Sequence, residues 1–141
     1  MKKKLLLDIN VVLDVLLERG GHSEPAAALW RAVEGGAAIG FIPAHGLTTA
    51  YYLARRERGP SFARRVVEEL LSVFRAARVD EQVLRRALAL SWPDFEDAVC
   101  AASAVVAGCD VIATRDPTGF RNAPLPVLDP SSAVAWLAGA R

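Results

Sequence analysis

The segment from Trp92 to Phe120, WPDFEDAVCAASAVVAGCDVIATRDPTGF, restricts the fold more than any other part of the chain. It opens with carboxylates at an expected helix start and continues as an alanine- and valine-rich helix. The small side chains of such a helix are typical of close packing against a sheet. After Gly108 a short apolar strand leads into Asp116. Packing explains the helix and the strand, but it does not explain the acidic side chains at their ends.

Apolar strands alternate with single or paired helices along the whole chain. Capping residues, glycine stops and side chains at helical spacing define the boundaries. Strands are expected at 4–9, 37–42, 78–80, 110–114 and 126–128. Helices are expected at 10–19, 23–34, 43–58, 60–76, 81–90, 93–107 and 131–138. This alternation is typical of an α/β fold with a mostly parallel central sheet flanked by helices.

The size of the chain favours one domain. With 141 residues and 52% hydrophobic content, it is long enough to bury one core and too short to bury two. No linker, low-complexity tract or internal repeat interrupts it. We therefore expect a single domain over residues 1–141.

Hydropathy argues against a membrane protein. The apolar runs are shorter than the roughly 18 residues needed to span a bilayer. Lysines and then leucines begin the chain, but Asp8 and Asn10 interrupt the apolar run before it reaches the about 7 to 15 residues of a signal peptide. We therefore expect a cytoplasmic protein. Cys100 and Cys109 lie among apolar residues and are expected to be buried thiols.

The net charge of +1 excludes a chain that binds polyanions strongly through its overall charge, although a local basic surface remains open. Most arginines alternate with glutamates, as on solvated helix faces. Arg115 is the exception because it stands beside Asp116, and arginine bonds phosphate bidentately. His22 and His45 have no metal-ligand partner nearby in the sequence, so we expect them in a loop or at a helix start.

Acidic residues follow two of the predicted strands and begin one of the helices. In parallel sheets, ligands bind beyond the carboxyl ends of the strands, near the point where the strand order reverses. Asp8 and Asp116 belong at this edge. Asp97 is expected in the first turns of the helix before the strand that leads to Asp116, with Asp94 one turn earlier on the same side.

Carboxylates gathered at one edge repel each other and need a positive partner. Oxygen ligands suit Mg²⁺ or Mn²⁺, and such a site can activate a water molecule for attack on a phosphodiester. Asn10 and Thr114 could orient a ligand or that water. The alternative is a structural role as helix caps, turn residue and helix-dipole partner for Asp8, Asp94, Asp116 and Asp97. The expected topology brings these separate acids together, which favours the metal site.

A resemblance to a known family covers nearly the whole chain. It rests on the segments LLLDIN, PAHGLTTAYYLARR and DFEDAVCAASAVVAGCDVIATRDPTGF, of which the last is the most specific. In this order they resemble a PIN domain, the nuclease fold of many toxin–antitoxin ribonucleases such as VapC-like toxins. The resemblance implies that Asp8, Asp97 and Asp116 bind the metal, with Asn10 in polar contact around them and Asp94 as an auxiliary acid. It further implies Mg²⁺- or Mn²⁺-dependent cleavage of RNA, a homodimer and an antitoxin partner.

The helix after the second predicted strand departs from the pattern of this family. Many PIN nucleases carry a glutamate there, whereas this chain has Thr48 and Thr49, and its nearest acid is Glu57. The sequence resembles a subgroup with threonines at this place. Thr48 or Thr49 either contacts a metal-bound water or is a buried structural residue. The missing glutamate leaves a second function open, that of a catalytically weakened or inactive PIN-like module that binds RNA or a protein.

Phosphotransfer through an aspartyl intermediate is a third alternative, because phosphatases and receiver domains also place an aspartate after the first strand. Those families need a lysine near the site, and this chain has none after Lys4, so we do not expect that chemistry.

The two predicted helices 43–58 and 60–76 carry more apolar surface than a small sheet covers. We therefore expect part of them to form the interface of a homodimer. The three tryptophans, Trp30, Trp92 and Trp136, are expected to anchor the core or an interface.

Overall fold

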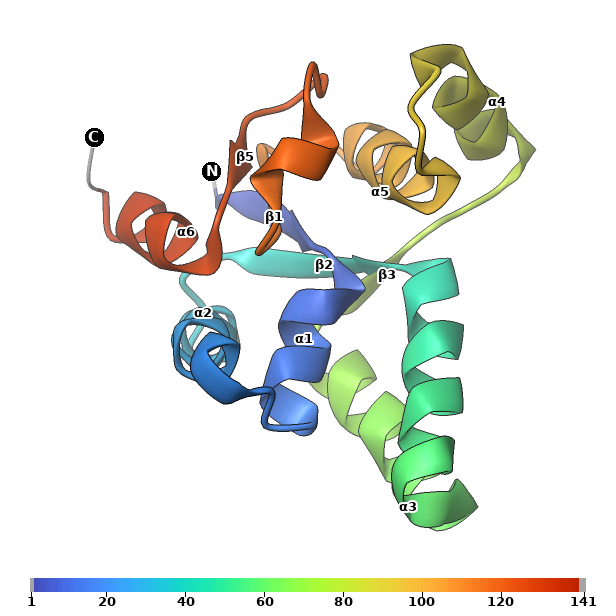
Figure 1. Ribbon diagram of the computed structural model, residues 1–141. Helices are drawn as coiled ribbons and strands as arrows, with labels where there is room; N and C mark the ends of the chain where they lie inside the picture. Colours follow the sequence, from blue (N-terminus) through green and yellow to red (C-terminus); the bar gives the residue numbers. More distant parts are fainter. Residues whose placement is uncertain (1, 140–141) are drawn as a thin grey trace.

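The computed structural model describes residues 2–139, which form a three-layer α/β fold (Figure 1). Its central sheet has five parallel strands in the order β3-β2-β1-β4-β5. Their bounds are β1 Lys4–Leu7, β2 Ile39–Pro43, β3 Arg75–Ala77, β4 Val111–Ala113 and β5 Val127–Leu128. This architecture confirms the predicted fold class. The strand order reverses between β1 and β4. The connection after β1 leads to β2 on one side of this point, and the connection after β4 leads to β5 on the other side.

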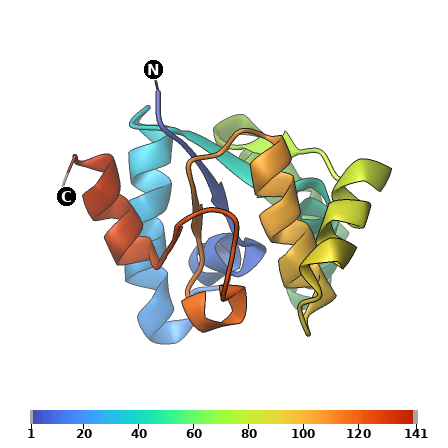
Figure 2. The same cartoon turned by 90° about the horizontal axis from the view of Figure 1, so that it is seen from above.

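Helices cover both faces of the sheet. The α-helices are α1 Ile9–Leu16, α2 Ser23–Glu34, α3 Ala44–Val73, α4 Glu81–Leu90, α5 Phe95–Val106 and α6 Pro130–Leu137. There are also two short 3₁₀ helices: η1 Gly20–His22 lies between α1 and α2, and η2 Pro117–Phe120 lies between β4 and β5. Helices α1, α2, α3 and α6 pack on one face, and α5 packs on the other with α4 beside it. Figure 2 shows α6 beside α2 at one side of the sheet and α4 beside α5 at the opposite side.

The central position of strand β1 in the sheet explains why its sequence is continuously apolar. Leu5, Leu6 and Leu7 are fully buried. Successive side chains of a strand point to opposite faces, so Leu5 and Leu7 join the core under α1, α2 and α3, while Leu6 joins the core under α5. Cys100 and Cys109 are buried free thiols, as predicted.

Several element boundaries differ from the predicted ones. The first strand ends at Leu7, because Asp8 takes the N-cap position of α1 and Ile9 already belongs to that helix. The prediction of a strand at 78–80 is wrong. The chain leaves α3 at Phe74 in an extended conformation (φ −115°, ψ 159°) and pairs with β2 at once, as β3.

Other predicted boundaries are confirmed. Gly59 (φ 85°) breaks the helical conformation inside α3, so the two predicted helices exist on either side of a kink. Asp80 caps α4, since its Oδ1 accepts a hydrogen bond from the Val83 backbone N–H at 3.1 Å. Across residues 2–139, none of the helices combines the length and hydropathy of a membrane span.

The tryptophans pack as anchors of the fold. Trp30 is buried and makes an edge-to-face contact with Phe74, with ring centroids 5.2 Å apart. Trp92 makes the same type of contact with Phe120 at 5.6 Å. Each pair joins elements that are distant in the sequence.

Candidate functional site

The ends of β1 and β4 fix the first acidic side chain. The Asp8 backbone N–H donates to the Ala113 carbonyl at 2.9 Å, which ties the two strand ends together. Although Asp8 occupies the N-cap of α1, its side chain makes no capping hydrogen bond. Instead, its Oδ2 accepts a hydrogen bond from the fully buried Thr114 hydroxyl at 3.1 Å. The capping explanation therefore does not account for the Asp8 carboxylate.

The start of α5 supplies two further acids. Asp94 is the N-cap of this helix, and its Oδ1 accepts a hydrogen bond from the Asp97 backbone N–H at 3.1 Å. Asp97 lies in the first turn, opposite Asp116. A Cβ atom at Gly119 would lie 3.2 Å from Asp97 Oδ2 and 3.8 Å from Asp116 Oδ2. The two carboxylates thus border the space beside Gly119, where a larger residue would crowd Asp97.

These side chains line one cavity of about 230 Å³, which we call the acidic cavity. Its lining residues are Asp8, Asn10, Asp94, Glu96, Asp97, Thr114, Arg115, Asp116 and Phe120. The structure therefore brings together all the acids that the sequence singled out, together with Asn10, Thr114 and Arg115. Glu96, which shares the first turn of α5 with Asp97, also lines this cavity, beside Asp94 as the sequence suggested.

The acidic cavity is short of positive charge. Burial, followed by the carboxylates of Asp94, Asp8, Glu96 and Asp116, raises the pKa of Asp97 to about 7. Burial also raises the pKa of Asp8 above its usual value, against the hydrogen bond from Thr114, which lowers it. Ionised carboxylates are therefore costly here unless a cation lies among them.

Arg115 lines the acidic cavity, but its guanidinium is already paired with a carboxylate. Its Nη1 lies 2.8 Å from Oδ1 of Asp14, a carboxylate that is only 1% exposed. Arg19 Nη1 lies 3.8 Å from the same oxygen and donates to Asn10 Oδ1 at 3.1 Å. Asp14 thus holds Arg115 at the rim. The sequence analysis did not identify Asp14, and its only signal was a single acid on the apolar face of α1.

Thr48 does not reach the acidic cavity. Its hydroxyl donates to the His45 carbonyl at 2.7 Å, within the first turn of α3, and Thr49 does the same at 3.2 Å. Both threonine hydroxyls are therefore hydrogen-bonded within α3. The expectation that Thr48 contacts a metal-bound water is not supported by this arrangement, and the position is exposed rather than buried.

His45 begins α3, as expected, but it also lies beside the acids. Together with Asp8, Glu96, Asp97 and Cys100 it lines a small cavity of about 10 Å³. Its Nδ1 is buried and has no hydrogen-bond partner in the described part of the chain. Burial lowers the His45 pKa, while Glu96 and Asp8 raise it. The sequence analysis missed this neighbourhood, for which the signal was its place just after the carboxyl end of β2, next to β1.

The residues fit a divalent cation in their chemistry, because carboxylate oxygens are the ligands that Mg²⁺ and Mn²⁺ prefer. As the side chains stand in residues 2–139, no three His, Cys, Asp or Glu converge closely enough to enclose an ion. Asp97 and Asp116 are at least partly exposed and border the open space beside Gly119.

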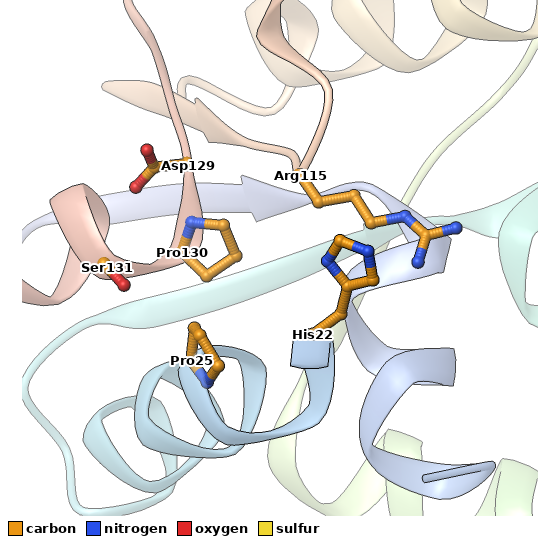
Figure 3. A pocket seen from close by; sticks show the side chains of 6 residues that line it. All are labelled: His22, Pro25, Arg115, Asp129, Pro130 and Ser131. Carbon is orange, nitrogen blue, oxygen red and sulfur yellow. The ribbon is translucent and has the colours of Figure 1, made fainter. Parts of the chain in front are cut away.

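Two other cavities border the acidic cavity. One of about 170 Å³ shares Arg115 with it and is otherwise lined by His22, Pro25, Asp129, Pro130 and Ser131 (Figure 3). Figure 3 shows the Arg115 side chain passing His22 and pointing away from Asp129 and Ser131. The other, of about 600 Å³, shares Asp94 and Asp97 with the acidic cavity.

Solved structures with this fold come from several bacteria. FitAcB from Neisseria gonorrhoeae is 22% identical, with a TM-score of 0.66 and coverage of 89% of this chain and 97% of that chain. VapC20 from Mycobacterium tuberculosis, described as a sarcin–ricin loop cleaving toxin, is 17% identical, with a TM-score of 0.62 and coverage of 77% and 86%. A toxin–antitoxin complex from Klebsiella pneumoniae is 21% identical, with a TM-score of 0.66 and coverage of 89% and 97%.

At these identities the likeness shows the fold alone. No curated protein sequence matches the chain. A sequence model of the PIN domain matches residues 4–118, which is most of the chain. The chain therefore belongs to the PIN domain family.

Proposed function

We propose that this protein is a metal-dependent endoribonuclease and the toxin of a toxin–antitoxin pair. The observation that carries the proposal is the shared cavity of Asp8, Asp97 and Asp116 at the ends of β1 and β4, where burial and then the neighbouring carboxylates raise the pKa of Asp97 to about 7. Family membership supports the nuclease activity, and the toxin–antitoxin complexes among the similar structures support an antitoxin partner.

In this proposal Asp8, Asp97 and Asp116 hold Mg²⁺ or Mn²⁺. A divalent ion bound there supplies a positive charge that activates a water molecule and neutralises the scissile phosphodiester. Thr114 fixes the Asp8 carboxylate through its hydrogen bond. The side-chain oxygen of Asn10 accepts a hydrogen bond from Arg19, and its amide N–H groups have no acceptor within residues 2–139, so they can orient a ligand. Asp94 positions Asp97 by capping α5.

Arg115 would contact the phosphate of the RNA substrate. Its guanidinium lies at the rim of the acidic cavity and has Asp14 on one side only, so other N–H groups remain for an incoming oxygen. Arginine is suited to this task because its planar fork of donors matches the geometry of phosphate.

The test is a cleavage assay on single-stranded and structured RNA, with Mg²⁺, with Mn²⁺ and with EDTA. Asp8→Asn, Asp97→Asn and Asp116→Asn should each lower the rate by at least about a hundredfold and leave the fold intact. Glu57→Gln is the matched control. It changes an exposed acid on α3, outside the acidic cavity, and should cut like the parent. Full activity in all three cavity variants, or cleavage that EDTA does not affect, would overturn the proposal.

A second candidate function is a PIN-like module that binds RNA or a protein with little or no catalysis. It is favoured by the acidic cavity receiving no acid from α3, since the side chains of Thr48 and Thr49 bond to their own helix. For this module, calorimetry would detect RNA binding that does not depend on divalent ions, and the assay above would detect no cleavage.

A further inference from the structure

The cavity of about 600 Å³ next to the acidic cavity has the size of a ligand site, which typically spans about 300 to 1,000 Å³. We call it the α4–α5 cavity, because the end of α4, the loop to α5 and the segment around η2 line it. Its lining residues are Ala89, Leu90, Ser91, Trp92, Pro93, Asp94, Asp97, Thr118, Gly119, Arg121 and Asn122. Asp94 and Asp97 line both cavities, so the two form one continuous surface.

Three polar side chains of this cavity are exposed and have no partner in the described protein. Within residues 2–139, the side chains of Ser91, Arg121 and Asn122 make no hydrogen bond or ion pair. Arg121 therefore differs from Arg115, whose charge is partly neutralised by Asp14. A guanidinium without a partner in the protein can bind an external anion such as a phosphate.

Two of these residues have a left-handed backbone conformation, which is uncommon for residues other than glycine. Ser91 (φ 56°, ψ 37°) ends α4 in the left-handed region, where helices commonly end on glycine. Asn122 (φ 60°) is also left-handed. A side chain in this region costs about 1 to 2 kcal/mol relative to glycine, less for asparagine. Both residues nevertheless place a hydroxyl or an amide at the cavity, as residues in strained conformations often do at ligand sites.

An aromatic pair joins the two cavities. Trp92 lines the α4–α5 cavity, and its ring meets Phe120 edge to face, with an interplanar angle of 80°. Phe120 lines the acidic cavity. Trp92 is half-buried, so it is held in position and keeps part of its surface toward the cavity. Such a ring is suited to stacking on a nucleobase.

We infer that the α4–α5 cavity binds the nucleotide next to the scissile phosphate of a single-stranded RNA. Arg121 contacts the neighbouring phosphate, Trp92 packs against the base, and Ser91 and Asn122 bond its polar edge. The strand must be unpaired, because only an unstacked base enters such a cavity. The inference rests on the proposed function only in taking the acidic cavity as the place of cleavage.

The test uses the full chain and a fluorescently labelled single-stranded RNA oligonucleotide. Arg121→Gln should weaken binding about tenfold and reduce the slope of log K against log salt by about one, since one phosphate contact is lost. Asn122→Gly removes the amide but suits the left-handed backbone, so it should weaken binding about threefold to tenfold without unfolding the protein. Arg64→Gln, an exposed arginine on α3, is the control and should bind like the parent.

Two further readouts separate this site from a structural role. In the cleavage assay, Arg121→Gln and Asn122→Gly should raise KM and leave kcat within about twofold, because neither residue lines the acidic cavity. RNA should also quench the Trp92 emission, so the quenching should vanish in Trp92→Phe although Trp30 and Trp136 remain.

The outcomes distinguish this inference from the proposed function. A parent that binds RNA with these dependencies but does not cut it would support the cavity and overturn the nuclease. A parent that cuts RNA, with unchanged KM and unchanged binding in Arg121→Gln and Asn122→Gly, would overturn the cavity and keep the nuclease. The cavity would also be excluded as an RNA site if these variants lost only the binding of a protein partner.

Discussion

At the scale of the residue, the pKa of Asp97 reflects its burial and the excess of negative charge in the acidic cavity. Its pKa is 3.8 in an ordinary environment and about 7 in the folded chain. The folded state therefore binds a proton that the unfolded state has already released between these two values. Without divalent ions, the free energy of unfolding should decrease as the pH rises from about 4 to about 7.

Urea unfolding in EDTA at several pH values measures this dependence. Asp97→Asn should flatten the profile, though not completely, because the pKa of Asp8 is raised as well. Glu57→Gln should keep the slope of the parent. Added Mg²⁺ should restore stability above pH 7 in the parent and much less in Asp97→Asn. An equal difference between parent and Asp97→Asn at pH 5 and at pH 7.5 would contradict the assignment.

Gly119 matters through the space that it leaves between two carboxylates. In Gly119→Ala the new methyl group would lie 3.2 Å from Asp97 Oδ2 and would push that carboxylate aside. We expect the affinity for Mg²⁺, measured by calorimetry, to fall about tenfold or more, while stability changes by less than about 1 kcal/mol. Gly21→Ala is the matched control, because a Cβ there meets no atom within 4 Å. Unchanged affinity in Gly119→Ala would place the ion elsewhere.

At the scale of the element, local sequence predicts helices better than the short edge strand. Asp80 as a cap and the break before Pro60 are local signals, and both are found where expected. The strand β3 has the sequence Arg75-Ala76-Ala77, which has little intrinsic preference for a strand. Its pairing with β2 decides its place, and pairing between distant segments is not visible in a local pattern.

Strand β2 depends on a glycine for its packing. A Cβ at Gly40 would lie 2.8 Å from both Phe74 and Val33, closer than side-chain atoms approach. Gly40→Ala should therefore lower the free energy of unfolding by about 1 to 3 kcal/mol, the typical cost of overpacking a core. Denaturant unfolding followed by the emission of Trp30, which packs on Phe74, measures this loss. Stability equal to that of the parent would mean that β2 or Phe74 can shift freely.

At the scale of the whole molecule, topology explains how much of the site the sequence could predict. Asp8 and Asp116 follow adjacent parallel strands, so an α/β pattern is enough to bring them to one edge. Asp14 and His45 were not predicted as neighbours of this edge. Their positions depend on how α1 faces Arg115 and how β2 aligns with β1. Such long-range packing leaves no signal at a fixed spacing in the sequence.

The homodimer is the remaining prediction at this scale. Helix α3 leaves Tyr52 64% exposed and also exposes Leu71, although both are large apolar side chains. Exposed apolar surface of this kind commonly marks an interface, and closed two-fold dimers are the commonest assemblies. We therefore expect light scattering at micromolar concentration to give twice the mass of the chain, and Tyr52→Glu to shift the protein toward the monomer.

Leu88→Glu is the matched control for this dimer. Leu88 is 65% exposed, almost the same fraction as Tyr52, but it lies on α4, across the sheet from α3. The two variants therefore add the same charge at equal exposure on opposite faces. Dissociation by Tyr52→Glu alone supports an interface on α3. Dissociation by Leu88→Glu alone moves the interface to α4, beside the α4–α5 cavity, and a parent that is monomeric removes the dimer.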